Sequence, residues 1–253
     1  MPRFCANLDF LFTERPFLDR FAAARAGGFE AVEILFPYDH DPAEIAARLA
    51  GEGLHLALIN TPAGDWAAGE RGFAARPGET ERFRDGVRRA TDLAARLGAA
   101  HVHLMAGCAA GAEARQTYLE NVAWAADSAP AQSFTVEPIN PFDIPGYFLA
   151  RFDDAAEILD TLARPNLHLQ FDAYHARRIE GDVMGLWARM GARAAHVQVA
   201  SPPGRHEPVR GEIDYPGFFA RLDADGYAGW VSGEYRPAGR TEDGLGWIAP
   251  PGA

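Results

Sequence analysis

Four segments typical of buried strands each end in, or close to, an oxygen-bearing side chain. The side chains are Glu137, Asp172, Gln198 and Glu234. Pro138 follows the first of them and fixes where that strand stops, because proline cannot donate to a β-ladder. A carboxylate is costly to bury unless it is paired or bound to a metal. A series of such strand ends therefore indicates one shared site.

The spacing of the four residues supports this interpretation. They follow one another at intervals of roughly 30 residues, which is the length of one βαβ unit. Side chains at the same ends of consecutive parallel strands converge on one point. Two glutamates, an aspartate and a glutamine amide form an all-oxygen set, which suits Mg²⁺ or Mn²⁺. The alternative is that each polar residue is separately capped or hydrogen-bonded near the barrel mouth.

Two further side chains follow these strand ends closely. His175 lies three residues after Asp172, where it can reach substrate oxygens or orient a ligand. Arg205 lies seven residues after Gln198, where a guanidinium can pair with a substrate carboxylate. The alternatives are a structural histidine and a solvated surface arginine.

Eight strands and seven helices can be placed along the chain. The expected strands are Phe4–Leu8, Ala31–Leu35, His55–Ile59, Ala100–Met105, Ser133–Glu137, Leu167–Phe171, Ala195–Val199 and Gly229–Glu234. The expected helices are Phe17–Ala26, Pro42–Gly51, Thr80–Leu97, Gln116–Ala126, Ala155–Leu162, Val183–Met190 and Tyr215–Ala224. Strands that alternate with helices predict a parallel sheet.

The length of the chain favours a closed barrel over an open sheet. The chain has 253 residues, close to the roughly 250 of a single eight-stranded α/β barrel. No glycine-rich dinucleotide fingerprint follows the first strand, and no stretch reads as a linker between two small domains. We therefore expect a single (β/α)8 TIM barrel of the α/β class over residues 1–253.

One expected loop, residues 60–78, is unusually long. It leaves the third strand on the same side as the four polar strand ends. Loops of this length are commonly lids or binding loops, so we expect a lid over the active site with Trp66 as its apolar anchor. The alternative is that Trp66 only pins the loop to the rim. Asn60 and Trp66 join His175 and Arg205 as candidate substrate-binding residues.

Composition excludes several classes of function. The net charge is −11, and all 24 basic residues are arginine, so Schiff-base, pyridoxal-phosphate and Walker-type phosphate chemistry, which need lysine, are excluded. The sequence has no cluster of basic residues that would indicate binding to nucleic acid. It also has no apolar run long enough to span a membrane. Cys5 and Cys108 have no partner motif, which favours reduced thiols in a cytoplasmic protein.

Five motifs resemble the hydroxypyruvate isomerase family. They are Asn60-Thr-Pro-Ala-Gly-Asp-Trp-Ala-Ala-Gly-Glu-Arg-Gly72, Glu137-Pro-Ile-Asn-Pro-Phe-Asp-Ile-Pro-Gly146, Phe171-Asp-Ala-Tyr-His175, Gly204-Arg-His-Glu-Pro208 with Gly211-Glu-Ile213, and Gly233-Glu-Tyr-Arg-Pro237. The resemblance covers nearly the whole chain. Two places depart from it: Ser201-Pro202 stands where the family usually has Asp-Asn, and Val209-Arg210 replaces a Gly-Thr-like pair.

The resemblance implies a xylose-isomerase-like barrel with one divalent metal held by Glu137, Asp172, Gln198 and Glu234. It also implies that Glu137 and Glu234 are the catalytic pair. The expected reaction interconverts hydroxypyruvate and tartronate semialdehyde through a cis-enediolate. The expected partner is a small hydroxy-oxo-acid or sugar, with neither nucleic acid nor membrane, and a homo-oligomer is compatible with the sequence.

Three other functions compete with this expectation. The same metal and glutamate pair serve a 2-oxo-tetronate isomerase, or an isomerase or epimerase of free ketoses. A nuclease or phosphoesterase on the same barrel favours several metals with histidine ligands and a basic surface. A sugar-binding module without catalysis needs no pair of proton-transferring glutamates.

Overall fold

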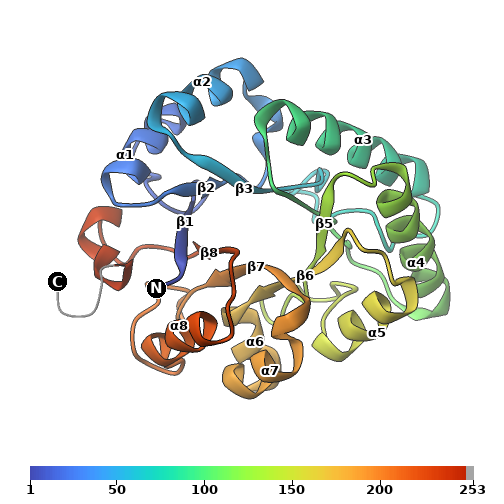
Figure 1. Ribbon diagram of the computed structural model, residues 1–253. Helices are drawn as coiled ribbons and strands as arrows, with labels where there is room; N and C mark the ends of the chain where they lie inside the picture. Colours follow the sequence, from blue (N-terminus) through green and yellow to red (C-terminus); the bar gives the residue numbers. More distant parts are fainter. Residues whose placement is uncertain (249–253) are drawn as a thin grey trace.

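A closed barrel of eight parallel strands forms the centre of the computed structural model, which describes residues 1–248 (Figure 1). The strands are β1 (Arg3–Asn7), β2 (Ala31–Glu33), β3 (His55–Asn60), β4 (His101–His103), β5 (Ser133–Val136), β6 (Leu167–Asp172), β7 (Ala194–Val199) and β8 (Trp230–Gly233). Each strand pairs with its neighbours in sequence, and β1 pairs with β8 to close the barrel. The expected fold class is confirmed. The expected domain also includes 249–253, which lie outside the described residues.

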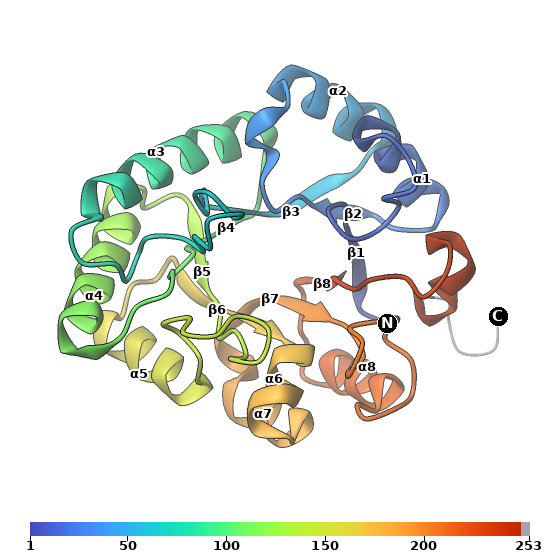
Figure 2. The same cartoon turned by 180° about the vertical axis from the view of Figure 1, so that it is seen from behind.

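Helices surround the barrel and cover its outer face (Figures 1 and 2). The α-helices are α1 (Arg20–Ala26), α2 (Pro42–Glu52), α3 (Thr80–Leu97), α4 (Gly111–Ser128), α5 (Phe152–Leu162), α6 (Ala173–Glu180), α7 (Val183–Met190) and α8 (Tyr215–Ala224). The 3-10 helices are η1 (Phe17–Asp19), η2 (Pro37–Asp39), η3 (Gly191–Arg193) and η4 (Thr241–Ile248). None of the helices within residues 1–248 is long and apolar enough to cross a membrane.

The last 3-10 helix, η4, stands where an eighth barrel helix would follow β8. Its Trp247 packs edge-on against Phe4 of β1, with ring centroids 5.0 Å apart, and lies 6.1 Å from the ring of Phe219 in α8. In Figure 1 this segment lies beside α1 and the start of β1. An aromatic cluster therefore covers the seam between the first and last strands.

Most expected elements are confirmed, with corrections at their ends. Helix α3 has the expected bounds, buries Phe83, Val87 and Ala90 against the barrel, and ends at Gly98 with a φ of 69°, a left-handed conformation that suits glycine. Strand β4 is shorter than expected, and α4 and α5 begin earlier. The largest miss is α6, whose first residue directly follows β6.

The interior of the barrel is polar toward the carboxyl ends of its strands. Side chains two residues apart on one strand face the same side, and polar residues recur at that spacing, as in Gln170 and Asp172 on β6 or His196 and Gln198 on β7. Contacts between β2 and β7 cross the barrel through Glu33. Near the other end lies a separate apolar cluster of Cys5, Ala31, Ala57 and Trp230. The polar half of the interior leads to the functional site.

Candidate active site

The four polar residues expected at strand ends lie together at the carboxyl-terminal end of the barrel. All four are buried. Glu137 and Gln198 are joined by the amide of Gln170, whose Nε2 lies 3.0 Å from Glu137 Oε2 and 2.8 Å from Gln198 Oε1. Thr135 donates a 2.9 Å hydrogen bond to Gln170 Oε1, at the other end of the same amide. The oxygens of Glu137 and Gln198 are thereby brought to one nitrogen atom.

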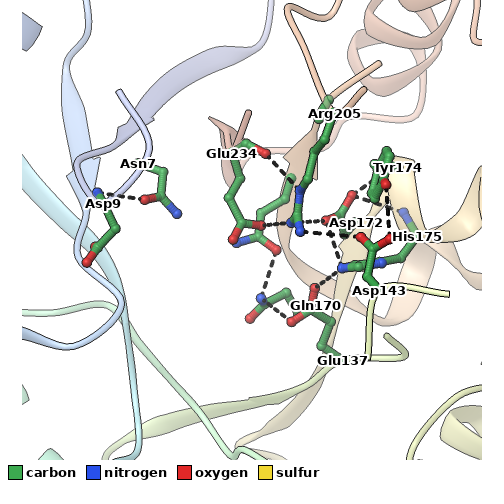
Figure 3. A network of polar contacts seen from close by, with 12 residues as sticks. Asn7, Asp9, Glu137, Asp143, Gln170, Asp172, Tyr174, His175, Arg205 and Glu234 are labelled. Carbon is green, nitrogen blue, oxygen red and sulfur yellow. Dashed lines mark hydrogen bonds and ion pairs between the residues drawn. The ribbon is translucent and has the colours of Figure 1, made fainter. Parts of the chain in front are cut away.

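The other two residues, Asp172 and Glu234, are joined by Arg205. Arg205 Nη2 donates to Glu234 Oε2 at 2.8 Å and to Asp172 Oδ2 at 3.3 Å (Figure 3). Its Nη1 lies 3.8 Å from Asp143 Oδ2, and its guanidinium carbon lies 5.0 Å from the centre of the Tyr174 ring. This guanidinium is held by three carboxylates. Its pairing with a substrate carboxylate remains a prediction.

The two carboxylate oxygens of Asp172 have different tasks. Oδ1 accepts hydrogen bonds from the backbone nitrogens of Tyr174 and His175, at 2.7 and 3.3 Å. It therefore caps the N-terminus of α6, a position that aspartate favours. Oδ2 faces Arg205 Nη2 at 3.3 Å and His175 Nε2 at 3.5 Å. Because the chain turns into a helix immediately after β6, His175 is brought back over the strand ends.

His175 presents an N–H group to the site. Its Nδ1 accepts from the backbone nitrogen of Asn140 at 3.3 Å and lies 2.7 Å from Asn140 Nδ2. Since a backbone N–H can only donate, Nδ1 carries the lone pair and Nε2 carries the proton in the neutral ring. Nε2 lies 3.8 Å from Glu137 Oε1 and 3.5 Å from Asp172 Oδ2. This tautomer suits a donor to substrate oxygen and not a metal ligand.

Gln198 is held from below by a buried carboxylate. Its Nε2 donates to Glu33 Oε1 at 2.9 Å, and Asn7 Nδ2 donates to the same oxygen at 2.6 Å. His196 Nε2 lies 2.6 Å from Glu33 Oε2. Burial alone would raise the pKa of Glu33, but the charge and hydrogen bond of His196 and the bonds from the two amides lower it. Glu33 is therefore an ionised carboxylate that fixes the Gln198 amide.

Burial raises the pKa of every carboxyl group proposed as a ligand. The pKa of Glu234 rises to about 8 and that of Asp172 to about 6, each by burial and against the opposing charge of Arg205. The pKa of Glu137 is raised well above its ordinary value by burial and by the charges of Glu234 and Asp172. Burial and neighbouring negative charges both favour the protonated form of a carboxyl group.

The residues fit a divalent cation. Carboxylate oxygens of Glu137 and Asp172 lie within 4.8 Å of each other, close enough to share one ion, and the His175 ring lies beside them. The Arg205 guanidinium pairs with two of the carboxylates, so this cluster already binds a positively charged group. Carboxylate and amide oxygens are the ligands that Mg²⁺ and Mn²⁺ prefer. Two points stay predictions. One is the ligand set, Glu137, Asp172, Gln198 and Glu234, and the other is the identity of the metal.

A cavity of about 780 Å³ opens above these residues, and the loop between β3 and α3 forms part of its wall. Trp66 lines the cavity, is 49% exposed, and is flanked by the Phe36 ring at 5.9 Å and the Arg71 guanidinium at 3.7 Å. Asn60 also lines it, with Oδ1 3.2 Å from His103 Nδ1. Both residues are placed to meet a ligand, and a lid function for this loop remains a prediction.

Several residues of the site were not identified from sequence patterns. Gln170 lies two residues before Asp172 on β6, and this i, i+2 spacing is the signal for it. Glu33 closes a short strand, just as Glu137 follows one, and an earlier polar strand end is a signal that was overlooked. Asp143 and Arg236 also line the cavity, and although both lie in motifs shared with the family, their residue types alone did not mark them as site residues.

Comparison with known proteins places the chain in a family. The model of the xylose isomerase-like TIM barrel matches residues 21–250. The chain belongs to the xylose isomerase-like TIM barrel family. A shared barrel does not by itself define a reaction, so relatives that are similar over their full length carry more weight than the fold.

Two curated relatives are similar over nearly their whole length. The chain is 51% identical to a 2-oxo-tetronate isomerase of Cupriavidus necator, with 99% of this chain and 98% of that protein covered. It is 42% identical to the hydroxypyruvate isomerase of Escherichia coli, with 99% of each covered. The resemblance to the hydroxypyruvate isomerase family is confirmed, and the chain is an isomerase of the aldose–ketose class.

A solved structure shows the same barrel. It is the crystal structure of AP endonuclease, family 2, from Brucella melitensis, which is 45% identical, covers 99% of both chains and has a TM-score of 0.96. The backbone that positions the site is therefore shared with an experimentally determined protein.

Proposed function

We propose that this isomerase moves the carbonyl of a short 2-oxo-3-hydroxy acid between carbons 2 and 3, with Glu137 and Glu234 as the acid/base pair. Hydroxypyruvate would give tartronate semialdehyde. The observation that carries the proposal is that two buried carboxyl groups line one cavity from the ends of β5 and β8, which are not neighbours. A substrate can lie between them with a carboxyl group on each side.

The proton transfers use groups that already face the cavity. One glutamate removes the proton from carbon 3, and the resulting cis-enediolate is protonated at carbon 2 by the other. A second proton passes between the two oxygens, and the Nε2–H of His175 is placed to donate to one of them. General acid–base catalysis of this kind contributes about 10²–10⁴-fold.

A divalent cation would complete the site. Mg²⁺ or Mn²⁺, held by Glu137, Asp172, Gln198 and Glu234, would supply the Lewis acid that makes the carbon–hydrogen bond acidic enough. Binding of such an ion would also compensate the negative charge of the ligand carboxylates, so that Arg205 need not neutralise them alone. The loop between β3 and α3 would keep bulk water from the enediolate.

A specific observation favours 2-oxo-tetronate as a second candidate substrate. The relative at 51% identity carries that name. 2-Oxo-tetronate is hydroxypyruvate with a hydroxymethyl group on carbon 3, so the same two carbons react. A cavity of about 780 Å³ is large enough for the additional group.

The name of the Brucella melitensis protein raises a nuclease as a rival function. The net charge of −11 and the carboxyl groups that line the cavity disfavour a polyphosphate substrate. Within residues 1–248, the cluster of candidate metal ligands contains one histidine, whereas a nuclease on this barrel favours several metals with histidine ligands.

The experiment is a substrate panel in D₂O followed by proton NMR. Hydroxypyruvate, 2-oxo-tetronate and a free ketose are incubated with enzyme and Mg²⁺ or Mn²⁺. We expect conversion of an oxo-acid, with deuterium entering at carbon 2 or carbon 3. Turnover of the ketose with neither acid converted would overturn the proposal, and deuterium exchange would exclude a module that only binds sugar.

A further inference from the structure

Two arginines line the cavity, and their surroundings differ. Arg205 has a side chain that is 15% exposed and is held by Glu234, Asp172 and Asp143. Arg236 is exposed, lines the same cavity, and within residues 1–248 its guanidinium has no ion pair or hydrogen bond. One cation is therefore already engaged, while the other is free to bind a ligand.

The position of Arg236 follows from the strand that precedes it. The backbone N–H of Glu234 donates to Val199 at the end of β7, at 3.2 Å, and that of Arg236 donates to Arg205 in the loop after β7, at 2.7 Å. Tyr235 between them is fully buried and bonded to Trp247. Glu234 and Arg236 both line the cavity.

The backbone of Arg236 is fixed on both sides. Its N–H donates to the carbonyl oxygen of Arg205, and its own carbonyl accepts from His206 Nδ1 at 2.8 Å. Ser201 and His206 in turn exchange two backbone hydrogen bonds and close the segment that holds them. The α-carbon is thus held in place, although the side chain is exposed.

We propose that Arg236 binds the carboxylate of the substrate and selects 2-oxo acids over neutral ketoses. The inference rests on the proposed function and names a specificity residue for it. With carbons 2 and 3 between Glu137 and Glu234, the carboxylate of carbon 1 can reach the part of the cavity that Arg236 lines. A planar guanidinium pairs with a carboxylate through two parallel hydrogen bonds.

The charge around the cavity explains why such a residue is needed. Four carboxyl side chains line it, those of Asp9, Glu137, Asp143 and Glu234, and a fifth, that of Asp172, pairs with Arg205 in its wall. An anionic substrate is repelled by them unless a cation compensates. A ketose that carries CH₂OH in place of the carboxylate gains little from the same guanidinium.

The test compares Arg236→Gln with the wild type on two matched substrates, hydroxypyruvate and dihydroxyacetone, which differ only in carboxylate against CH₂OH. We expect KM for hydroxypyruvate to rise about 10- to 100-fold, the range of a lost charge-assisted hydrogen bond, while kcat stays within a few-fold. The inhibition constant of dihydroxyacetone should not change. Arg236→Lys should give an intermediate KM, because lysine keeps the positive charge but cannot make the two parallel hydrogen bonds of a guanidinium.

Arg240→Gln is the matched control. Arg240 is exposed, four residues further along, and outside the cavity, so its loss should leave both constants unchanged. Calorimetric binding of D-glycerate, which has the carboxylate but no carbonyl to isomerise, gives a second measurement that does not depend on turnover. We expect the same loss of affinity in Arg236→Gln.

Two results would contradict the proposal, and a third would separate it from the proposed reaction. Equal losses for hydroxypyruvate and dihydroxyacetone would give Arg236 a structural role. An unchanged KM and unchanged glycerate affinity would assign the carboxylate to another group, with Arg205 the first candidate. A wild type that binds glycerate through Arg236 but converts no oxo-acid would overturn the proposed reaction and leave the carboxylate site standing.

Discussion

Gln198 on β7 donates a 2.9 Å hydrogen bond to the buried carboxylate of Glu33 on β2, across the barrel. Because the Gln198 amide nitrogen donates to Glu33, the Gln198 amide oxygen faces the Gln170 side chain and the three carboxylates that are the other proposed ligands. A carboxylate below the site thus decides which atom of an amide is offered to a cation. Contacts of this kind commonly orient metal ligands.

Removing the acceptor at position 33 should weaken metal binding. Glu33→Leu leaves the Gln198 amide free to turn, and we expect Mn²⁺ affinity to fall about 10- to 100-fold. Glu33→Gln is the matched variant, because it keeps one acceptor oxygen, and its loss should be smaller. Titration calorimetry gives the affinities, and circular dichroism checks folding. Equal affinity in the leucine variant and the wild type would show that Glu33 does not position Gln198.

Glu137→Gln and Glu234→Gln should each abolish turnover. The substitutions keep size and hydrogen bonding but remove the group that accepts a proton, so we expect losses of about 10²–10⁴-fold or more in kcat/KM. Glu30→Gln, an exposed site near β2, is the control for handling and folding. Deuterium exchange at the reacting carbon should disappear together with turnover. A near-normal rate in either variant would remove that glutamate from the mechanism.

Removal of divalent metal should inactivate the enzyme without unfolding it. The carboxylates keep Arg205 as a counter-ion, so the barrel retains its fold. Mg²⁺ and Mn²⁺, added back separately, should restore activity. A saturating ion at 100 times its dissociation constant should stabilise the protein by about 2.7 kcal/mol, measured as a shift in thermal unfolding. Full activity in protein shown by mass spectrometry to be metal-free would contradict the metal requirement.

Metal binding should release protons at neutral pH. Burial raises the pKa of Glu234 to about 8 and that of Glu137 well above its ordinary value. In the metal-free protein the folded state therefore holds more protons than the unfolded state above pH of about 4.5, and its stability falls as the pH rises from there toward 8. Metal affinity should increase over the same range.

Calorimetry of Mn²⁺ binding in buffers of different ionisation enthalpy counts these protons. We expect net release at pH 7 in the wild type and less release in Glu234→Gln. An apparent enthalpy that is the same in every buffer would mean that the carboxylates are already ionised in the metal-free protein.

Much of the fold and part of the site could be predicted from the sequence. The eight strands and the order of polar strand ends follow from alternating segments of one chain, and parallel pairing of neighbours fixes where those ends lie. The missed helix α6 has a local cause. Asp172 caps it through one oxygen while pairing with Arg205 through the other, and a residue interpreted as a ligand was not also interpreted as a cap.

The sequence by itself determined that Glu137, Asp172, Gln198 and Glu234 meet at one end of a barrel. Only the tertiary structure decided how they meet. Glu33 and Gln198 are 165 residues apart, and Arg205 and Glu234 are 29 apart, so no local pattern records either contact. Closing the barrel sets which buried donors face which acceptors, because each must find a partner inside. Arg205 is thereby engaged by carboxylates and Arg236 left free, which residue type and spacing alone do not distinguish.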